Sequence, residues 1–347
     1  MASVEDKVFL LSRRWAHHAN HSGYDILGRH IAKTLSAKPI PDIFLPNRLF
    51  WKMTKNMIGY DRTGAALEMM AAAHMTTRSG CIYHLLYGDN CFNYLGALNG
   101  WRNHRVIASF HLPPRRLAEW VRKPDQLQQL SAVIILGCNQ LPFFEGILPR
   151  ERIILVPYAV DTSFFTPPSK FSQREENLCL FVGSHLRDYE TLSSVIENAR
   201  ILAPQLRFAL VAHPKALANF NGVVGNFTLH SDIRESELLA LYQKATLVIQ
   251  PLQDAVANTA LLEGMACGTP IVVTEIGAVR EYVTENCACF VPPYNPEGML
   301  EAILSLVNDP VRCRDMSNNA RQEALKFDWS IVAGQMRKAY EQILALD

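Results

Sequence analysis

Short strand-like runs alternate with helix-like segments along almost the whole chain, and this alternation limits the fold more than any other feature. In the first half, runs rich in β-branched and aromatic residues read KVFLLS, CIYHLLYG, RVIASFH, AVIILG and RIILVPY. Amphipathic segments at 24–36 and 62–76 predict helices between such runs. Strands that alternate with helices favour a parallel sheet covered by helices. The sequence therefore predicts an α/β fold.

The alternation starts again in the second half, where the runs read LCLFVG, LRFALVAH, NFTLH, ATLVIQP and PIVVTE. Between the halves, residues 161–177 are polar, contain a Pro pair and lack periodicity, which predicts an interdomain linker. The chain has 347 residues, more than one core of about 100 to 150 residues needs. We expect two α/β domains, over 1–160 and 161–329.

Composition excludes several classes of protein. Lys and Arg number 34 against 33 acidic residues, so no overall charge attracts nucleic acid. The 8 cysteines include no CxxC pair, which predicts reduced thiols in a cytoplasmic protein. The N-terminus does not resemble a signal peptide, and no apolar run approaches the ~20 residues of a membrane span. We expect a soluble protein, or one that rests on the inner face of a membrane.

One strand end in the second half has the features of a phosphate site. The run ATLVIQP leads through a loop into ALLEGMACG, a helix that Gly268 and Pro270 should end. Ligands of such sheets bind where the strands end, and N–H groups near 257–260 with the Thr259 hydroxyl are able to hold a phosphate. Glu263, one turn further, is placed to accept hydrogen bonds from vicinal hydroxyls. The alternative is a Thr259 N-cap and a solvated Glu263.

The segment NTALLEGMACGTPIVVTEIGAVREYV resembles the signature of the family 4 glycosyltransferases, which are retaining enzymes of the GT-B fold. Further similar stretches occur in the expected order: HSGYD, VIASFHLPP, ERIILVPYAVDTSFFTP, LCLFVGSHLRDYETL, SDIRESELLALYQKATLVIQP and FDWSIVAGQMRKAYEQIL. The resemblance is strong over 150–290 and weaker over 36–76. It implies two Rossmann-like domains facing each other across a cleft, with a closing helix at about 330–347 that crosses back to the N-terminal domain.

The resemblance implies a nucleotide-sugar donor site in the domain at 161–329. Glu263 matches the second of two paired glutamates and would hold the ribose of the donor. Ala255 stands where the first glutamate is usual, and the adjacent Asp254 would reach the sugar hydroxyls if the loop is shifted by one residue. Asn258 and Thr259 match positions that meet the phosphates and the sugar.

The strand end VG and its loop match the family's diphosphate-binding segment. Gly183, Ser184 and His185 occupy its early positions, and Arg187 is the expected cation, since Arg suits bidentate phosphate recognition. The alternative for Arg187 is a surface salt bridge. Recognition of the base would fall to backbone groups of the loop 230–233, which ends at Ile233, and the identity of the base stays open.

Two residues of the first domain are further candidates. His111 follows a strand and precedes Leu-Pro-Pro, and in the family such a histidine faces the transferred sugar; otherwise it is a polar loop residue. Gly23 either permits a turn or lets the backbone approach the diphosphate and the acceptor.

Breaking a sugar–phosphate bond leaves a diphosphate with new negative charge, which Arg187 and the helix N-terminus near Thr259 would stabilise. The sequence has no Asp-x-Asp triplet, so we expect metal-independent transfer with no cofactor besides the nucleotide-sugar substrate. His17, His18 and His21 lack acidic or cysteine neighbours and predict no metal site. The family implies retention of the anomeric configuration.

The acceptor is undefined and is a small molecule, a glycan or a lipid-linked glycan. Residues 48–62 and 113–123 mix aromatic and cationic residues, which predicts either membrane-surface contact or ordinary covering helices. A dehydrogenase is disfavoured, since no GxGxxG follows the first strand. A nucleotide-sugar epimerase of the same fold and a catalytically silent nucleotide-sugar binding protein remain alternatives, the latter because of Ala255.

Overall fold

The structure is a computed structural model that describes residues 4–15, 19–41, 50, 52, 54 and 58–346. The chain divides into two compact units. The first contains Met1–His18, Gly23–Tyr158 and Trp329–Asp347, and the second contains Ala19–Ser22 and Ala159–Asp328. The expectation that 161–177 is a linker is wrong, because this segment lies inside the second unit, where Phe165 is fully buried.

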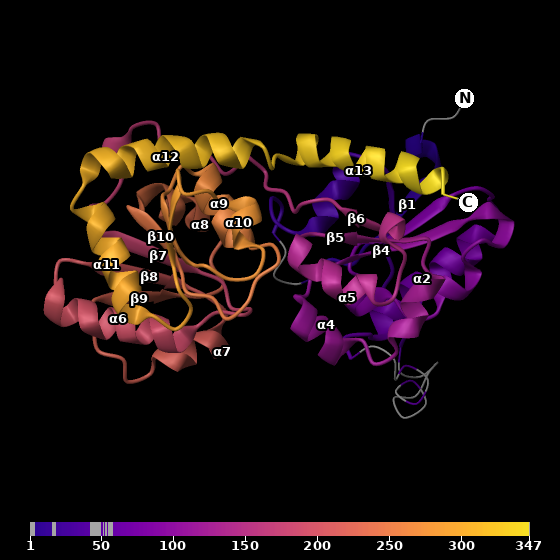
Figure 1. Cartoon of the computed structure of the whole chain (residues 1–347), viewed down its shortest axis with the longest axis horizontal. Helices are drawn as coiled ribbons and strands as arrows, with labels where there is room; N and C mark the ends of the chain where they lie inside the picture. The colour runs from indigo at the N-terminus through magenta and orange to yellow at the C-terminus, as the bar shows by residue number, and fades with distance from the viewer. Residues whose placement is uncertain are drawn as a thin grey trace. The chain divides into compact units, whose positions relative to one another are not determined.

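The first unit is built on a six-stranded parallel sheet of order β2-β1-β3-β4-β5-β6 (Figure 1). Its four central strands β1, β3, β4 and β5 are almost wholly buried because helices cover both faces of such a sheet. They are β1 (Val8–Leu11), β2 (Lys33–Leu35), β3 (Ile82–Leu85), β4 (Arg105–Phe110), β5 (Ala132–Ile135) and β6 (Ile153–Leu155).

Helices surround this sheet and include the C-terminal helix of the chain. They are α2 (Arg62–Met75), α3 (Gly88–Cys91), α4 (Pro114–Trp120), α5 (Leu141–Glu145) and α13 (Trp329–Leu344). The predicted helix at 62–76 is confirmed, and the Asp61 carboxylate caps it through the N–H groups of Thr63 and Gly64.

Helix α13 is joined to the sheet by a buried polar contact. The Tyr340 hydroxyl lies 2.8 Å from Nδ1 of His84 on β3, and Nε2 of His84 lies 2.8 Å from the Ser109 hydroxyl. Burial lowers the pKa of His84 to about 3, so its imidazole is neutral at neutral pH. The closing helix therefore belongs to the first unit, as the family resemblance implies.

The helix expected over 24–36 is wrong. A 3-10 helix covers only Tyr24–Arg29, and β2 follows at Lys33–Leu35. The apolar residues of this segment fit a helical spacing, but the three residues of β2 pair with β1, with Leu10 opposite Thr34. A strand of three residues is too short to show the alternation from which a strand is recognised.

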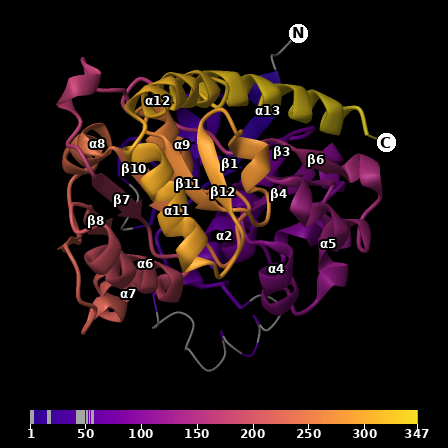
Figure 2. The same ribbon diagram turned by 60° about the vertical axis from the view of Figure 1, so that its left-hand side comes forward.

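The second unit contains a six-stranded parallel sheet of order β12-β11-β10-β7-β8-β9 (Figure 2). Counted from β7 as the first strand, this is the Rossmann order 3-2-1-4-5-6 read from the other edge. The strands are β7 (Leu178–Val182), β8 (Arg207–Val211), β9 (Phe227–His230), β10 (Leu247–Gln250), β11 (Ile271–Thr274) and β12 (Ala288–Val291).

The helices of the second unit complete the α/β fold. They are α6 (Tyr189–Leu202), α7 (Pro214–Leu217), α8 (Glu235–Lys244), α9 (Thr259–Ala266), α10 (Val279–Tyr282), α11 (Pro296–Val307) and α12 (Pro310–Leu325). One core cluster joins α6, α11 and the sheet through residues such as Phe181, Ile196 and Ile303, all fully buried. Strand order reverses between β7 and β10, which is where such folds bind ligands.

No helix among the described residues is long and apolar enough to cross a membrane. All eight cysteines lie in the described part of the chain, and none of them forms a disulfide there.

Candidate active site

The loops that follow β7 and β10 meet at the point where the strand order of the second unit reverses. Arg187 and Leu252 form an isolated antiparallel bridge between these loops. The Gln253 N–H donates to the Leu186 carbonyl at 3.0 Å, and the Asp188 N–H donates to the Pro251 carbonyl at 3.0 Å. Segments far apart in the sequence thus form one surface at the carboxyl ends of two neighbouring strands.

Arg187 is folded back against the end of β7. Its guanidinium donates to the Val182 carbonyl at 3.1 and 3.2 Å and to the His185 carbonyl at 2.9 Å. Gly183 has a φ of +109°, and a Cβ atom there would collide with the guanidinium. Gly183 is therefore required both for the turn and for the close approach of Arg187.

The N-terminus of α9 lies against this arginine. Asn258 is the N-cap residue, and its Oδ1 accepts hydrogen bonds from the Ala260 N–H at 3.1 Å and from Arg187 at 3.3 Å. The alternative of a Thr259 cap is wrong, because Thr259 is the exposed first residue of the helix. Burial lowers the pKa of Arg187 to about 10, so the side chain stays cationic at neutral pH. A cation and a helix N-terminus together form an anion-binding surface.

Glu263 is buried in the second turn of α9, and not solvated as the alternative supposed. The Tyr242 hydroxyl of α8 donates to Glu263 Oε2 at 2.9 Å. Burial raises the pKa of Glu263 to about 8, against the opposing effect of the Tyr242 hydrogen bond. A carboxyl group held in an apolar site with one partner is suited to accept hydrogen bonds from ligand hydroxyls.

The raised pKa of Glu263 predicts a specific pH dependence of stability. The pKa of Glu263 is about 8 in the native state, whereas the ordinary value of 4.5 applies in the unfolded state. The native state therefore binds more protons than the unfolded state between these two pH values. Stability should fall as pH rises through this window, by at most about 1.4 kcal/mol per pH unit. Urea unfolding from pH 5 to 8.5 should show this slope in the wild type and a flatter profile in Glu263→Gln. Equal slopes would contradict the assignment.

Asp254 and Ala255 lie in the loop after β10. The Asp254 carboxylate accepts the Ala255 N–H at 2.8 Å. Ala255 is 4% exposed, and its carbonyl accepts the Ala278 N–H at 3.1 Å. Gly277, with a φ of +57°, packs directly on the Ala255 backbone. With Ala255 in place of a glutamate, the half-buried Asp254 supplies the carboxylate of this loop. Its contact with the donor sugar stays a prediction.

The loops after β8 and β9 border the same edge of the sheet. The exposed Ser184 accepts the His213 N–H through its hydroxyl at 2.8 Å, which ties the β7 and β8 loops together. Asp232 has a φ of +53°, and the half-buried Ile233 follows it just before α8. The structure thus brings together at one edge most of the donor-site residues named above: Gly183, Ser184, His185, Arg187, Asn258, Thr259 and Glu263.

His111 lies in the first unit, directly after β4. Its backbone N–H donates to Asp89 at 2.7 Å, and its Nε2 lies 2.8 Å from the Leu86 carbonyl, so Nε2 carries the proton. The ring stacks on Tyr87 at 5.0 Å and meets the edge of Tyr24 at 4.9 Å. Burial raises the pKa of Asp89 to about 7. His111 is therefore held in one orientation at the end of a central strand.

Gly23 is buried and has a φ of +108°, a conformation that favours glycine. It precedes the 3-10 helix Tyr24–Arg29, and the Tyr24 N–H donates to the Tyr87 hydroxyl at 2.9 Å. The turn reading of Gly23 is thus confirmed, while its approach to a diphosphate stays a prediction.

Sequence reasoning missed two residues of these edges. Tyr242 holds Glu263, and Asp89 holds the His111 backbone. The partners are 21 residues apart in the first pair and 22 in the second, so no local sequence pattern predicts either contact. The described residues contain no group of three metal-ligating side chains. His17, His18 and much of the aromatic and cationic stretch 48–62 lie outside the described residues.

The chain is similar in sequence to known glycosyltransferases. Residues 165–323 match the family Glycosyl transferases group 1. A D-inositol 3-phosphate glycosyltransferase of Thermobispora bispora is 25% identical over 222 residues, which cover 56% of this chain and 52% of that protein. The chain spans about half the length of the curated relatives it matches.

Two solved structures share the fold over nearly the whole chain. Sucrose-phosphate synthase from Thermosynechococcus elongatus has a TM-score of 0.73 at 19% identity, with 98% of this chain and 99% of that chain covered. Anabaena HepE in complex with UDP and glucose has a TM-score of 0.70 at 13% identity, with 97% and 99% covered.

Two Rossmann-like units with six parallel strands each define the GT-B class of fold. Over residues 165–323 the chain is similar to the group 1 glycosyltransferases. The family resemblance read from the sequence is thereby confirmed.

Proposed function

We propose that the chain is a retaining glycosyltransferase that moves a sugar from a nucleoside-diphosphate sugar to a hydroxyl acceptor. One observation supports this most: Arg187, the Asn258-capped N-terminus of α9 and the buried Glu263 lie together at the strand reversal point. An anion site next to a hydroxyl-accepting carboxyl suits a diphosphate joined to a ribose. The match to a transferase family supports the enzyme class.

The proposed mechanism relies on fixed positive charge. As the sugar–phosphate bond breaks, Arg187 and the N–H groups that begin α9 would stabilise the departing diphosphate, so no metal ion is required. His111, held through Asp89 and Leu86, would contribute from the first unit to the geometry of the transferred sugar. Inversion of the anomeric configuration in the product would overturn the retaining mechanism.

The acceptor and the location of the protein are also proposals. We infer a hydroxyl-bearing small molecule, glycan or lipid-linked glycan, and a cytoplasmic protein, since reduced thiols fit that compartment. Helix α4 covers most of 113–123, and its Arg115 and Arg116 pair with Glu119, which supports the covering-helix reading. Contact with a membrane surface stays a prediction.

A donor should stabilise the wild type and not a variant of the ribose site. In thermal unfolding with UDP, GDP, ADP and TDP and their common sugars, one ligand at ~100 times its dissociation constant should add about 2.7 kcal/mol. Glu263→Gln should lose most of this gain, because the carboxyl group is able to give up its proton and accept two hydroxyls, whereas an amide is not. The isosteric change keeps the volume of the buried site.

Failure of every nucleotide to shift the wild type would contradict the donor assignment. Binding without turnover across a wide acceptor panel would favour a silent binding protein, for which Ala255 is the supporting feature. Release of a free epimerised sugar without an acceptor would favour an epimerase.

A further inference from the structure

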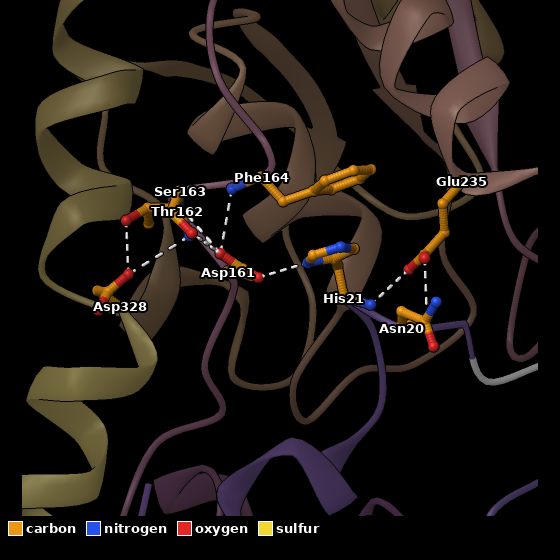
Figure 3. A network of polar contacts seen from close by, with 8 residues as sticks. All are labelled: Asn20, His21, Asp161, Thr162, Ser163, Phe164, Glu235 and Asp328. Atoms are coloured by element: carbon orange, nitrogen blue, oxygen red, sulfur yellow. Dashed lines mark hydrogen bonds and ion pairs between the residues drawn. The ribbon is translucent and has the colours of Figure 1, made fainter. Parts of the chain in front are cut away.

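Residues 19–22, which we call the strap, cluster with the second unit although their sequence neighbours belong to the first. Two consecutive backbone N–H groups of the strap, those of Asn20 and His21, donate to the two carboxylate oxygens of Glu235, each at 2.7 Å (Figure 3). A carboxylate that accepts two backbone N–H groups is a strong, charge-assisted anchor. Glu235 is the first residue of α8 and lies more than 200 residues away in sequence.

A second contact fixes the side chain of the strap. The His21 ring stacks on Phe164 with centroids 3.9 Å apart and an angle of 4°, and its Nδ1 lies 2.6 Å from Asp161 Oδ2 (Figure 3). The other oxygen of Asp161 accepts the N–H and hydroxyl of Ser163 and the N–H of Phe164. Burial raises the pKa of Asp161, but hydrogen bonds from Ser163 and His21 outweigh it, so the pKa lies below its usual value.

Helix α8 links the strap to the ribose side of the donor site. Tyr242 stands seven residues after Glu235, so the two side chains lie on the same face of the helix. The Tyr242 hydroxyl donates to Glu263 at 2.9 Å, and the negative charge of Glu235 contributes to the raised pKa of Glu263. The strap also directly precedes Gly23, for which the sequence predicts contact with the diphosphate.

We propose that Glu235 is a positioning residue that anchors the strap to α8 and thereby couples the order of residues 19–22 to occupation of the donor nucleotide site. The coupling rests on the proposed function, whereas the anchor does not. Coupling between two sites is reciprocal. If the nucleotide stabilises the ordered strap by some factor, loss of the anchor should weaken nucleotide binding by the same factor.

Amide hydrogen exchange at single-residue resolution tests the anchor directly. In the 347-residue chain without nucleotide, Glu235→Ala should lose at least about tenfold of the protection at the Asn20 and His21 amides, because both lose their acceptor. Glu301→Ala is the control: it removes an exposed carboxylate from α11 of the same unit and should leave both amides unchanged. If Glu235→Ala does not fold, Glu235→Gln, which keeps one acceptor oxygen, should expose one amide.

The coupling is tested with UDP, or with whichever of the four diphosphates gives the shift described above. The dissociation constant should rise about five- to tenfold in Glu235→Ala, and the nucleotide should raise protection of both amides in the wild type by a similar factor. Unchanged exchange in Glu235→Ala would overturn the anchor. Lost protection with unchanged nucleotide affinity would overturn the coupling. A wild type that binds no nucleotide overturns the proposed function and with it the coupling, while the exchange result still decides the anchor.

Discussion

Arg187→Ala is expected to lower kcat/KM for the sugar donor about 10²- to 10³-fold, the usual effect of removing one donor to a developing anion. The guanidinium lies between the β7 loop and the Asn258 cap of α9, so alanine removes the side-chain cation of this anion site. Initial rates with varied donor concentration measure the effect. Arg187→Lys should recover only part of the activity, because an ammonium cannot reproduce the planar fork.

A loss of folding could imitate this result, since Arg187 also binds the carbonyls of Val182 and His185. Thermal unfolding of Arg187→Ala should therefore be compared with that of Arg200→Ala, which removes an exposed cation from α6 in the same unit. Activity of Arg187→Ala within threefold of the wild type would contradict a role in stabilising the leaving group.

Arg174→Ala is expected to destabilise the second unit by about 3 kcal/mol or more, without any direct effect on the donor site. Arg174 is 9% exposed, and its guanidinium donates to carbonyls at the C-terminal ends of α8 and α9. The shortest contacts are to Ala245 at 2.7 Å, Gly268 at 2.8 Å and Cys267 at 2.9 Å. The Gly268 carbonyl also accepts the Ser317 hydroxyl, but the Ala245 and Cys267 carbonyls have no helical partner, so alanine would leave these two buried and unsatisfied.

For a unit of this size, that loss corresponds to a fall in melting temperature of about 6 to 12 °C. Calorimetry of the variant measures it. Arg207→Ala is the control, because Arg207 is exposed and pairs with Glu175 at the surface, and its removal should cost less than about 1 kcal/mol. A melting temperature of Arg174→Ala equal to that of the control would show that water replaces the guanidinium.

Local patterns in the sequence determined the fold class and, together with the family resemblance, predicted most of the proposed donor site. The apolar runs at β7 and β10 are continuous because both faces of each strand are buried, and each is followed by turn and cap residues such as Gly183 and Asn258. A motif confined to one strand, one loop and one helix can be recognised from the sequence because its residues are neighbours along the chain. Glu263 was found in this way, whereas Arg187 was predicted from the family resemblance.

The tertiary structure alone decided which distant groups hold these residues in place. The segment 161–177 looked like a linker because its polar residues have no period, yet Arg174 caps two helices and Asp161 binds His21. Tyr242 meets Glu263 only because α8 and α9 pack on the same sheet. Contacts between residues 21, 93 or 215 positions apart produce no periodic pattern in the sequence. The folded chain can bring together residues at any separation, so such contacts are not predictable from local spacing.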